Sequence, residues 1–364
     1  MLESWAADPP RGVRLWVVVD RPVAVYSGMV PGVVAGQYPP GAIEIDVRPL
    51  ATRAGAQVIV ARALGVEPAE RRLLLEGREP LRYDSASFDV GSTVAGLDLP
   101  GVREHALPTR PIASFVERVG EVVARARERA HFRLVVVGAG AGGVELAFAF
   151  EARLRREGVR AASVALLESG DRVLSGSPAG VAQRIERNAR ARGIEIRHGA
   201  RVEAVEPDRI RLAGGESLSC DAVAWVAGAA SLPLFRSSGL PLDDRGFVRV
   251  RSTLQVVGCD ELFAAGDCAS LVERPGLPKA GVYAVRQGPA LAGNLRAHSR
   301  GERLRPYRPQ RDFLSLLNLG DGRAIGSKWG VSFEGRWVFR LKDRIDRRFV
   351  QRFQLPSPGS GGAA

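Results

Sequence analysis

Cysteine is scarce in this sequence, and its spacing excludes two common ways of stabilising a small domain. The 364 residues contain 3 Cys, at Cys220, Cys259 and Cys268, with no CxxC or Cys/His spacing. This pattern argues against a disulfide framework and against a structural zinc site. The few unpaired cysteines indicate a protein of a reducing compartment. The 4 His are scattered too, so we expect no metal site.

Long apolar runs are missing as well. No segment approaches the roughly 18 consecutive apolar residues of a membrane-spanning helix, and no charged-then-apolar leader opens the chain. We therefore expect a cytoplasmic protein that, at most, lies peripherally on the inner face of a membrane.

Lysine is rare although the chain is basic. Of 52 Lys and Arg, only Lys279, Lys328 and Lys342 are lysines, and the net charge is +12. Such an arginine skew is typical of GC-rich coding, so we do not expect a nucleic-acid partner. Residues 301–364 hold 13 basic and 6 acidic residues, a net of 13 − 6 = +7, so more than half of the excess lies near the C-terminus.

What is present indicates a folded α/β protein of two or three domains, with 45% hydrophobic and 25% charged residues. The clearest unit runs from Phe132 to Ser169. A buried-type strand at Arg133–Val137 leads into the glycine run GAGAGG, then a helix-forming stretch that Gly158 stops, then a strand at Ser163–Leu167 that ends at Glu168. This order of elements predicts a βαβ unit that binds a dinucleotide.

The glycines of this unit have separate physical tasks. Gly138 permits the tight turn, Gly140 lets the backbone approach a pyrophosphate, and Gly143 lets the helix pack closely on the strand. The amides at the helix start would hold the phosphates. Glu168 can accept hydrogen bonds from an adenosine ribose, which favours NAD over NADP. A glycine turn without a ligand is the alternative.

A second, fragmentary unit opens the chain. Val13–Val19 has the pattern of a strand and ends in Asp20, yet no strand and no glycine turn precede it. One interpretation is a nucleotide-binding fold whose first strand and phosphate loop are missing, so that Met1 is not the true start. The other is coincidence, because Asp is common at strand ends.

Two later segments also place ligand-binding residues after strands. Leu262–Ala265 precedes Gly266 and Asp267, whose carboxylate could bind a polyol hydroxyl. The apolar strand within Asp221–Ala229 ends at Gly228, where the backbone can pass close to a ligand.

These motifs, in this order, resemble the two-domain flavoproteins of the pyridine nucleotide-disulfide oxidoreductase superfamily, and within it the type II NADH dehydrogenase-like group. The chain looks most like the FAD/NAD(P)-binding module that is joined to selenide, water dikinase in some bacteria. The segments that carry the resemblance are YSGMVPG, IDVRPLATRAGA, SFDVGST, GAGAGGVE, FAAGDCA, AVRQGPALAGNL and FEGRWVFRLKDRIDRRF.

The resemblance implies roles for individual residues. Asp20 would bind the FAD adenosine ribose and Asp267 the ribityl chain, while Gly91 and Gly228 would end the two strand-to-loop motifs. NADH would be held by the residues already described for the complete unit. Glu145 would lie near the nicotinamide, or it is an acid in a first helical turn that favours the helix dipole.

The chain also departs from the family. It has no FAD phosphate loop and no CxxxxC pair, and of the AQxAxQ-like quinone motif it keeps Ala284, Gln287 and Gly288. Cys259 and Cys268 flank the GD motif, as sulfur-carrying cysteines of sulfide:quinone reductases would, but we interpret them as small buried residues.

The C-terminal stretch Arg336–Phe353 has an amphipathic pattern. Its apolar residues recur at four-residue steps from Trp337 to Phe353, with arginines around them. Such a helix can lie on an anionic membrane surface or dock on its own domain. The tail PSPGSGGAA, from Pro356, is expected to be a disordered linker.

We therefore expect an α/β protein with two Rossmann-like domains, the first incomplete at its N-terminus. Residues 1–110 and 240–303 would form the FAD domain, 111–239 the NAD(P)H domain, 304–354 a C-terminal segment and 355–364 the tail. The predicted function is an FAD-dependent NAD(P)H oxidoreductase that prefers NADH and passes electrons to a small acceptor, with quinone as one candidate. The alternative is a non-catalytic module that binds NAD(H) without turnover.

Overall fold

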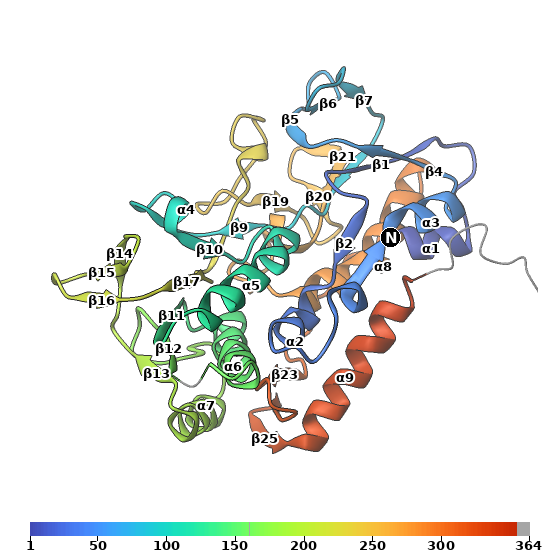
Figure 1. Cartoon of the computed structure of the whole chain (residues 1–364). Coiled ribbons are helices and arrows are strands. Elements are labelled where there is room, and N and C mark those ends of the chain that lie inside the picture. The colour runs from blue at the N-terminus through green and yellow to red at the C-terminus, as the bar shows by residue number, and fades with distance from the viewer. Residues whose placement is uncertain (160, 355–364) are drawn as a thin grey trace, which may run out of the picture.

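A five-stranded parallel sheet forms the middle of the chain in the computed structural model, which describes residues 1–159 and 161–354. The predicted tail, 355–364, lies outside the described residues. The strands follow the order β10-β17-β11-β12-β13 (Figure 1). Their bounds are Ala106–Pro108 for β10, Ala222–Trp225 for β17, Phe132–Val137 for β11, Ala162–Leu167 for β12 and Glu195–Arg197 for β13.

The two faces of this sheet are covered differently. Alternate residues of a strand point to opposite faces, so Leu134 and Val136 of β11 join the cluster made with the helices, whereas Val135 and Val137 join the cluster under an antiparallel sheet. The helices are α5 (Ile112–Arg127), α6 (Ala141–Arg156) and α7 (Ala179–Arg192), and the small sheet comprises β14 (Val202–Val205), β15 (Arg209–Leu212) and β16 (Ser217–Ser219).

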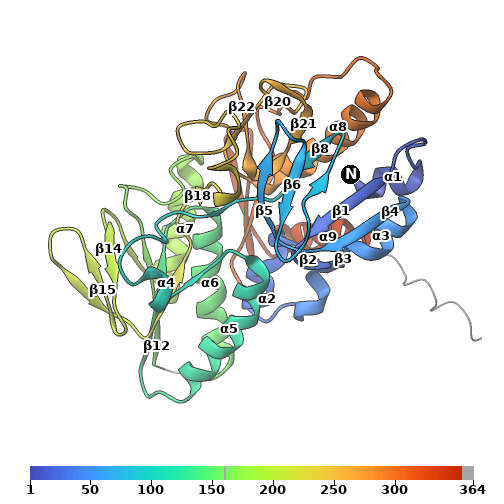
Figure 2. The same ribbon diagram turned by 90° about the horizontal axis from the view of Figure 1, so that it is seen from above.

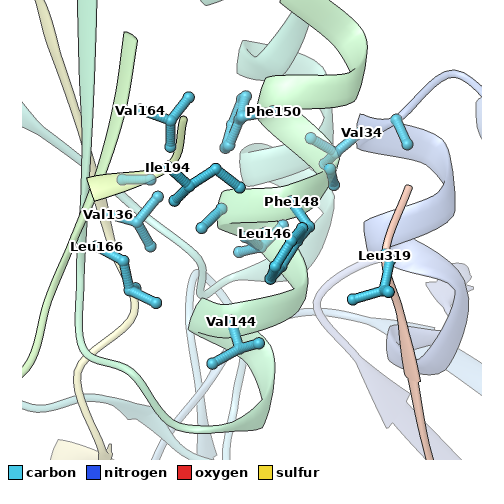
Figure 3. Packing of buried hydrophobic residues seen from close by; sticks show 14 of the residues in the cluster. Val34, Val136, Val144, Leu146, Phe148, Phe150, Val164, Leu166, Ile194 and Leu319 are labelled. Carbon is cyan, nitrogen blue, oxygen red and sulfur yellow. The ribbon is translucent and has the colours of Figure 1, made fainter. Parts of the chain in front are cut away.

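Helix α6 is buried on several sides, which explains why its middle, residues 146–150, is an unbroken run of buried apolar residues. Figure 3 shows Val136, Val164 and Leu166 of the sheet on one side of this helix, with Val34 and Leu319 on the other. Val34 ends the short helix α2 (Val30–Val34), and Leu319 follows β23 (Ser315–Asn318).

The first half of the molecule combines segments that precede β10 with segments that follow β18 (Ala229–Ala230), and the second half is the region around the five-stranded parallel sheet. Two separate sheets that contain parallel pairs lie in the first half. Strand β1 (Leu15–Val19) pairs in parallel only with β4 (Ala56–Val60). The second sheet has the order β22-β19-β20-β21-β8, in which β8 (Ala86–Phe88) pairs in parallel with β21 (Cys259–Ala264). Its other strands are β19 (Val248–Val250), β20 (Gln255–Val256) and β22 (Ala269–Leu271).

Helices and a small antiparallel sheet surround these two sheets. Trp5 of α1 is buried and donates to the carbonyl oxygen of Ala292 in α8 over 3.2 Å, which ties the start of the chain to this half. The helices are α1 (Leu2–Ala7), α3 (Val47–Arg53) and α8 (Gly281–Ser299), and the antiparallel strands are β5 (Ala63–Glu67), β6 (Arg72–Leu75) and β7 (Leu81–Arg82).

The two halves share part of one succession of elements. The succession β1, α3, β4 corresponds to β12, α7, β13, and the strands β8 and β17 are each followed, three residues on, by a glycine, Gly91 or Gly228. The segments beyond these glycines, β9 (Thr93–Val94) and β18 (Ala229–Ala230), pair with each other. In the second half β11 lies between β12 and β17, whereas no described strand lies between β1 and β8.

The start of the chain lies near this open position. In Figure 2 the N-terminus is drawn between β1 and β8. The α-amino nitrogen of Met1 is 3.9 Å from the place that a Cβ on Gly288 of α8 would take, and its charge acts on Asp89, the residue after β8.

The C-terminal segment packs across both halves. It comprises β23, β24 (Ala324–Lys328), β25 (Val331–Gly335) and α9 (Arg336–Gln351). Helix α9 buries Val338, Lys342, Asp346 and Val350, whereas Trp337, on the apolar stripe predicted from the sequence, is 55% exposed. Ile345 of the stripe is also exposed, whereas Leu341, Phe349 and Phe353 are half-buried, so the helix is rotated and the stripe lies at the edge of its buried face.

The remaining described elements are short. They include β2 (Val23–Val25), β3 (Glu44–Asp46) and α4 (Val102–His105). Among the described residues, no helix is both long and apolar enough to cross a membrane.

Candidate functional site

The glycine turn after β11 has the close packing that the sequence predicts. Gly138 has a φ of +101°, and a Cβ there would lie 2.8 Å from the carbonyl oxygen of Val226. A Cβ on Gly143 would overlap the carbonyl oxygen of Gly138. A side chain larger than hydrogen at these two positions would force the turn away from β17 or from the helix.

The start of α6 is left open for a ligand. Gly140 is the N-cap residue, no side chain caps the helix, and among the described residues no atom beyond Gly140 and its chain neighbours lies within 4 Å of a Cβ placed on Gly140. The first amides of a helix lack intrahelical acceptors and carry a positive partial charge. This turn therefore fits the diphosphate of a dinucleotide.

Glu168 lies at the same edge of the sheet and braces the turn. Its Oε2 accepts a hydrogen bond from the amide of Ala139 over 3.1 Å, and its Oε1 accepts one from the amide of Gly170 over 2.8 Å. The carboxylate is therefore oriented by the backbone on both sides of it.

In the first half, the structure brings together Gly266, Asp267 and Gln287. Gly266 has a φ of +70°, and its amide donates to Oε1 of Gln287 over 2.6 Å, which joins the GD turn to α8. Asp267 accepts a hydrogen bond from Nη2 of Arg110 over 2.9 Å and one from Oγ of Ser92 over 3.3 Å.

Sequence reasoning missed Arg110 and Ser92. Arg110 also donates to the carbonyl oxygen of Ser92 over 3.1 Å, so the linker between the two halves reaches the acid of the GD turn. The two partners of the ion pair are 157 residues apart in the chain, and no local pattern connects them.

The other predicted flavin residues are more isolated. Asp20 follows β1 and is exposed, and no hydrogen bond joins it to Asp267. Gly91 has a φ of +70°, as the strand-to-loop turn requires, and the carbonyl oxygen of Gly228 accepts from the amide of Ala95 over 2.7 Å. The roles of these residues toward FAD stay predictions.

Glu145 lies in a buried polar cluster rather than at a free helix end. Because α6 begins at Ala141, Glu145 is in the second turn, and the alternative of an acid in the first turn is wrong. Its Oε1 accepts from the amide of Asn318 over 2.8 Å. Burial raises the pKa of Glu145 to about 7, against the opposing effect of the Lys342 ammonium.

Three residues from distant parts of the chain complete this cluster. Lys342 donates to Asp346 over 2.7 Å and to the carbonyl oxygen of Gly28 over 2.8 Å, and the Tyr26 hydroxyl donates to Asp346 over 3.1 Å. Burial lowers the pKa of Lys342, but the carboxylates of Glu145 and Asp346 outweigh burial and leave this pKa above its usual value. The cluster can therefore hold a proton between carboxylates and an ammonium at neutral pH.

The two cysteines near the GD turn are placed unlike a sulfur-carrying pair. Cys259 begins β21 and Cys268 follows its other end, so a strand roughly 20 Å long separates them. Burial raises the pKa of the Cys268 thiol to about 12, and the thiol bonds to the carbonyl oxygen of Ala265 over 3.1 Å. No cluster of His, Cys, Asp or Glu in the described part of the chain could hold a metal ion.

The sequence is similar to NADH dehydrogenase-like proteins and quinone reductases. It is 28% identical over 288 residues to the demethylphylloquinone reductase of Synechocystis, covering 78% of this chain and 69% of that protein. It is 26% identical over 262 residues to an NADH dehydrogenase-like protein of Bacillus subtilis, covering 72% and 70%. A type II NADH:quinone oxidoreductase of Haemophilus influenzae is 27% identical over 167 residues, covering 45% of this chain and 37% of that protein.

Solved structures share the fold. The sulfide:quinone oxidoreductase of Aquifex aeolicus superposes with a TM-score of 0.82 at 15% identity, over 97% of this chain and 88% of that one. The NDH2 of Plasmodium falciparum in complex with NADH superposes with a TM-score of 0.79 at 13% identity, over 97% and 96%. The α/β fold with two Rossmann-like units is thereby confirmed. The family described as pyridine nucleotide-disulphide oxidoreductase matches residues 6–288, so this chain belongs to that family of flavin-dependent NAD(P)H oxidoreductases.

Proposed function

We propose that this chain oxidises NADH with FAD as its redox cofactor and passes the electrons to a quinone. The observation that carries the proposal is the open glycine turn at the start of α6. This turn packs on the segment that follows β17, the GD turn contacts the segment that follows β8, and the β9–β18 pair joins these two segments. The relatives named as quinone reductases support the choice of acceptor.

The second half fits a nicotinamide dinucleotide. Gly138, Gly140 and Gly143 would let the backbone amides of α6 approach the diphosphate, and Glu168 would accept hydrogen bonds from the adenosine ribose. A 2′-phosphate in that place would meet a carboxylate, so we propose NADH as the preferred donor.

The first half fits one part of FAD better than the other. Gly266 allows close approach, and Asp267 would bind ribityl hydroxyls once it shares or releases Arg110. Gln287 fixes this turn from α8, and Asp20 would bind the adenosine ribose. No glycine-rich turn precedes β1 in the described residues to hold the diphosphate.

The protein itself would contribute to the reaction by positioning the two cofactors and by supplying a proton. When bound, the two cofactors supply hydride transfer, and the reduction of a quinone to a quinol also consumes one proton from solvent. Glu145, whose pKa lies near neutral pH, would store that proton, while Lys342 and Asp346 keep the charge of the cluster balanced.

We also propose that α9 and the β24–β25 turn contact an anionic membrane, where a quinone would dissolve. Trp329 and Val331 in that turn are 77% and 64% exposed, and Trp337 and Ile345 of α9 are exposed beside arginines. Cosedimentation with anionic vesicles should fall for a Trp337→Ser variant, and equal binding to zwitterionic vesicles would contradict the idea. The likeness to the module joined to selenide, water dikinase remains a separate hypothesis.

The decisive experiment is reconstitution of the full chain with FAD. We expect the protein to retain flavin after desalting, NADH to bleach the flavin absorbance without oxygen, and a soluble quinone to restore it. Asp267→Ala should lose flavin, whereas the matched exposed variant Asp84→Asn should keep it. Failure of the reconstituted chain to retain flavin or to oxidise NADH would refute the proposal.

A second candidate is a module that binds NAD(H) without turnover. The ion pair of Arg110 with Asp267 favours it, because this pair occupies the acid that FAD would need. Tight NADH binding in a protein that retains no flavin is the outcome that distinguishes this candidate.

A further inference from the structure

Asp89 occupies a position in the first half that corresponds to Val226 in the second. Each residue directly follows its strand, β8 or β17, two positions before the glycine of the strand-to-loop turn. Val226 packs on the glycine turn: its carbonyl oxygen is 2.8 Å from a Cβ placed on Gly138, and its Cγ1 is 3.6 Å from one placed on Gly142. The corresponding position in the first half is thus on the side where a dinucleotide's phosphates would lie.

The first half has a carboxylate at the position where the second half has a valine, and this places a negative charge beside the GD turn. Oδ1 of Asp89 takes the space that a Cβ on Gly266 would need, which places the carboxylate against the GD turn. No hydrogen bond from the described residues reaches this carboxylate. A free carboxylate therefore lies directly beside the residues predicted to hold the cofactor.

The charges around Asp89 come from three elements. The Met1 α-amine at the start of α1 favours the ionised form of Asp89, whereas Asp267 disfavours it. The Cys268 thiol also lies near Asp89, on the same turn as Asp267. Arg110 is engaged with Asp267 and Ser92. Of these groups, only the Met1 amine acts directly on Asp89 as a counter-charge.

We propose that Asp89 weakens binding of an anionic dinucleotide to the first half when it is ionised, so that FAD binding tightens as the pH falls. This inference rests on the proposed function, because it assumes that FAD binds there. An ionised carboxylate and a diphosphate repel each other when they lie close together. Protonation of Asp89 removes that repulsion.

The protonation state of Asp89 can change in an accessible pH range. Although water reaches Asp89, its carboxylate is partly desolvated beside the GD turn. This desolvation together with Asp267 raises the pKa of Asp89 to about 6, against the opposing Met1 amine. If bound FAD raises this pKa by one further unit, linkage requires FAD affinity to be about tenfold higher at a pH below the titration than at a pH above it.

The test is an equilibrium titration of the flavin-free full chain with FAD at about pH 5 and about pH 8, on either side of the expected transition. For the wild type we expect about tenfold tighter binding at the lower pH. Asp89→Asn, which keeps the shape and removes the charge, should bind tightly at both. Asp89→Val, which copies Val226, should behave like Asp89→Asn, and the exposed control Asp84→Asn should behave like the wild type.

Riboflavin is the matched ligand control because it carries no phosphate. Its binding should not differ between the two pH values. The inference is overturned if Asp89→Asn keeps the wild-type pH dependence or binds FAD more weakly, or if riboflavin shows the same dependence as FAD. FAD binding that is independent of Asp89 would leave the proposed function intact, whereas no FAD binding by any variant would refute both.

Discussion

The two halves of this protein share a succession of strand, helix and strand, but the corresponding strands are buried to different degrees. The residues Val164 to Leu167 of β12 are all buried, because β11 and β13 flank the strand and packed layers cover both faces. The corresponding strand β1 has one partner, and its residues are half-buried or exposed, with Trp16 at 41%. A shared succession of elements therefore does not ensure an equally buried core: a parallel strand needs neighbours on both edges and cover on both faces.

The largest effect should come from truncating these corresponding strands. Leu166→Ala in β12 should lower the free energy of unfolding by about 2–5 kcal/mol, because it leaves a cavity in a packed core. Val18→Ala in β1 should cost about 1 kcal/mol or less, because the site is only half-buried. Chemical denaturation measures both, and equal losses would show that the two strands are stabilised alike.

The glycine turn of the second half gives the next contrast. Gly143→Ala should cost about 2–3 kcal/mol, because its Cβ would overlap the carbonyl oxygen of Gly138. Gly140→Ala has open space and should leave stability nearly unchanged while weakening NADH binding. Thermal unfolding combined with an NADH titration separates the two, and a fully stable Gly143→Ala protein would contradict the packing described.

How much of this could be predicted from the sequence depends on the distance between interacting residues. β11, α6 and β12 were predictable because glycine turns and apolar runs are local signals, and their observed ends differ from the predicted ones by a few residues. Predicted strand Val13–Val19 likewise appears as the shorter β1.

The polar clusters were not predictable. The Glu145–Lys342–Asp346 cluster and the Arg110–Asp267 pair join residues far apart in the chain. The amphipathic pattern of the C-terminal stretch predicted a helix but not its rotation, because Lys342 and Asp346 gain buried partners that hydrophobicity alone does not count.

Helix α9 extends the comparison, since it contacts an acid of each half. Glu145 of α6 lies in the buried cluster, whereas Glu3 of α1 forms a surface ion pair with Arg352 at 2.7 Å. The raised folded-state pKa of Glu145 means that its ionisation costs stability as the pH rises from about 4.5 through about 7.

Removing the Glu145 carboxylate should therefore stabilise the protein at high pH. Relative to wild type, Glu145→Gln should gain about 2 kcal/mol of stability at about pH 8 and little at about pH 4, where the carboxyl is neutral in both states. Glu3→Gln should change stability by less than about 1 kcal/mol, and salt should reduce even that. Denaturation at the two pH values measures this difference, and a pH-independent effect of Glu145→Gln would contradict it.

The smallest effect concerns the acids that end the corresponding strands. Glu168→Gln should cost about 1 kcal/mol, because the carboxylate accepts two backbone hydrogen bonds, and it should also reduce the preference for NADH over NADPH. Asp20→Asn, at an exposed position, should change stability by less than about 0.5 kcal/mol. A larger loss for Asp20→Asn would show that β1 depends on its terminal acid.

The crossing of α9 over both halves has a mechanical consequence. Lys342 and Asp346 of α9 form hydrogen bonds with Gly28 and Tyr26 of the first half and lie near Glu145 of the second half. At the end of the helix, Arg352 forms an ion pair with Glu3. The β9–β18 pair restrains the opposite connection between the halves. A hinge opening of one half from the other would have to break the buried hydrogen bonds of Lys342 and Asp346 to Gly28 and Tyr26 together with the β9–β18 ladder, so the two halves are held together at two separate places.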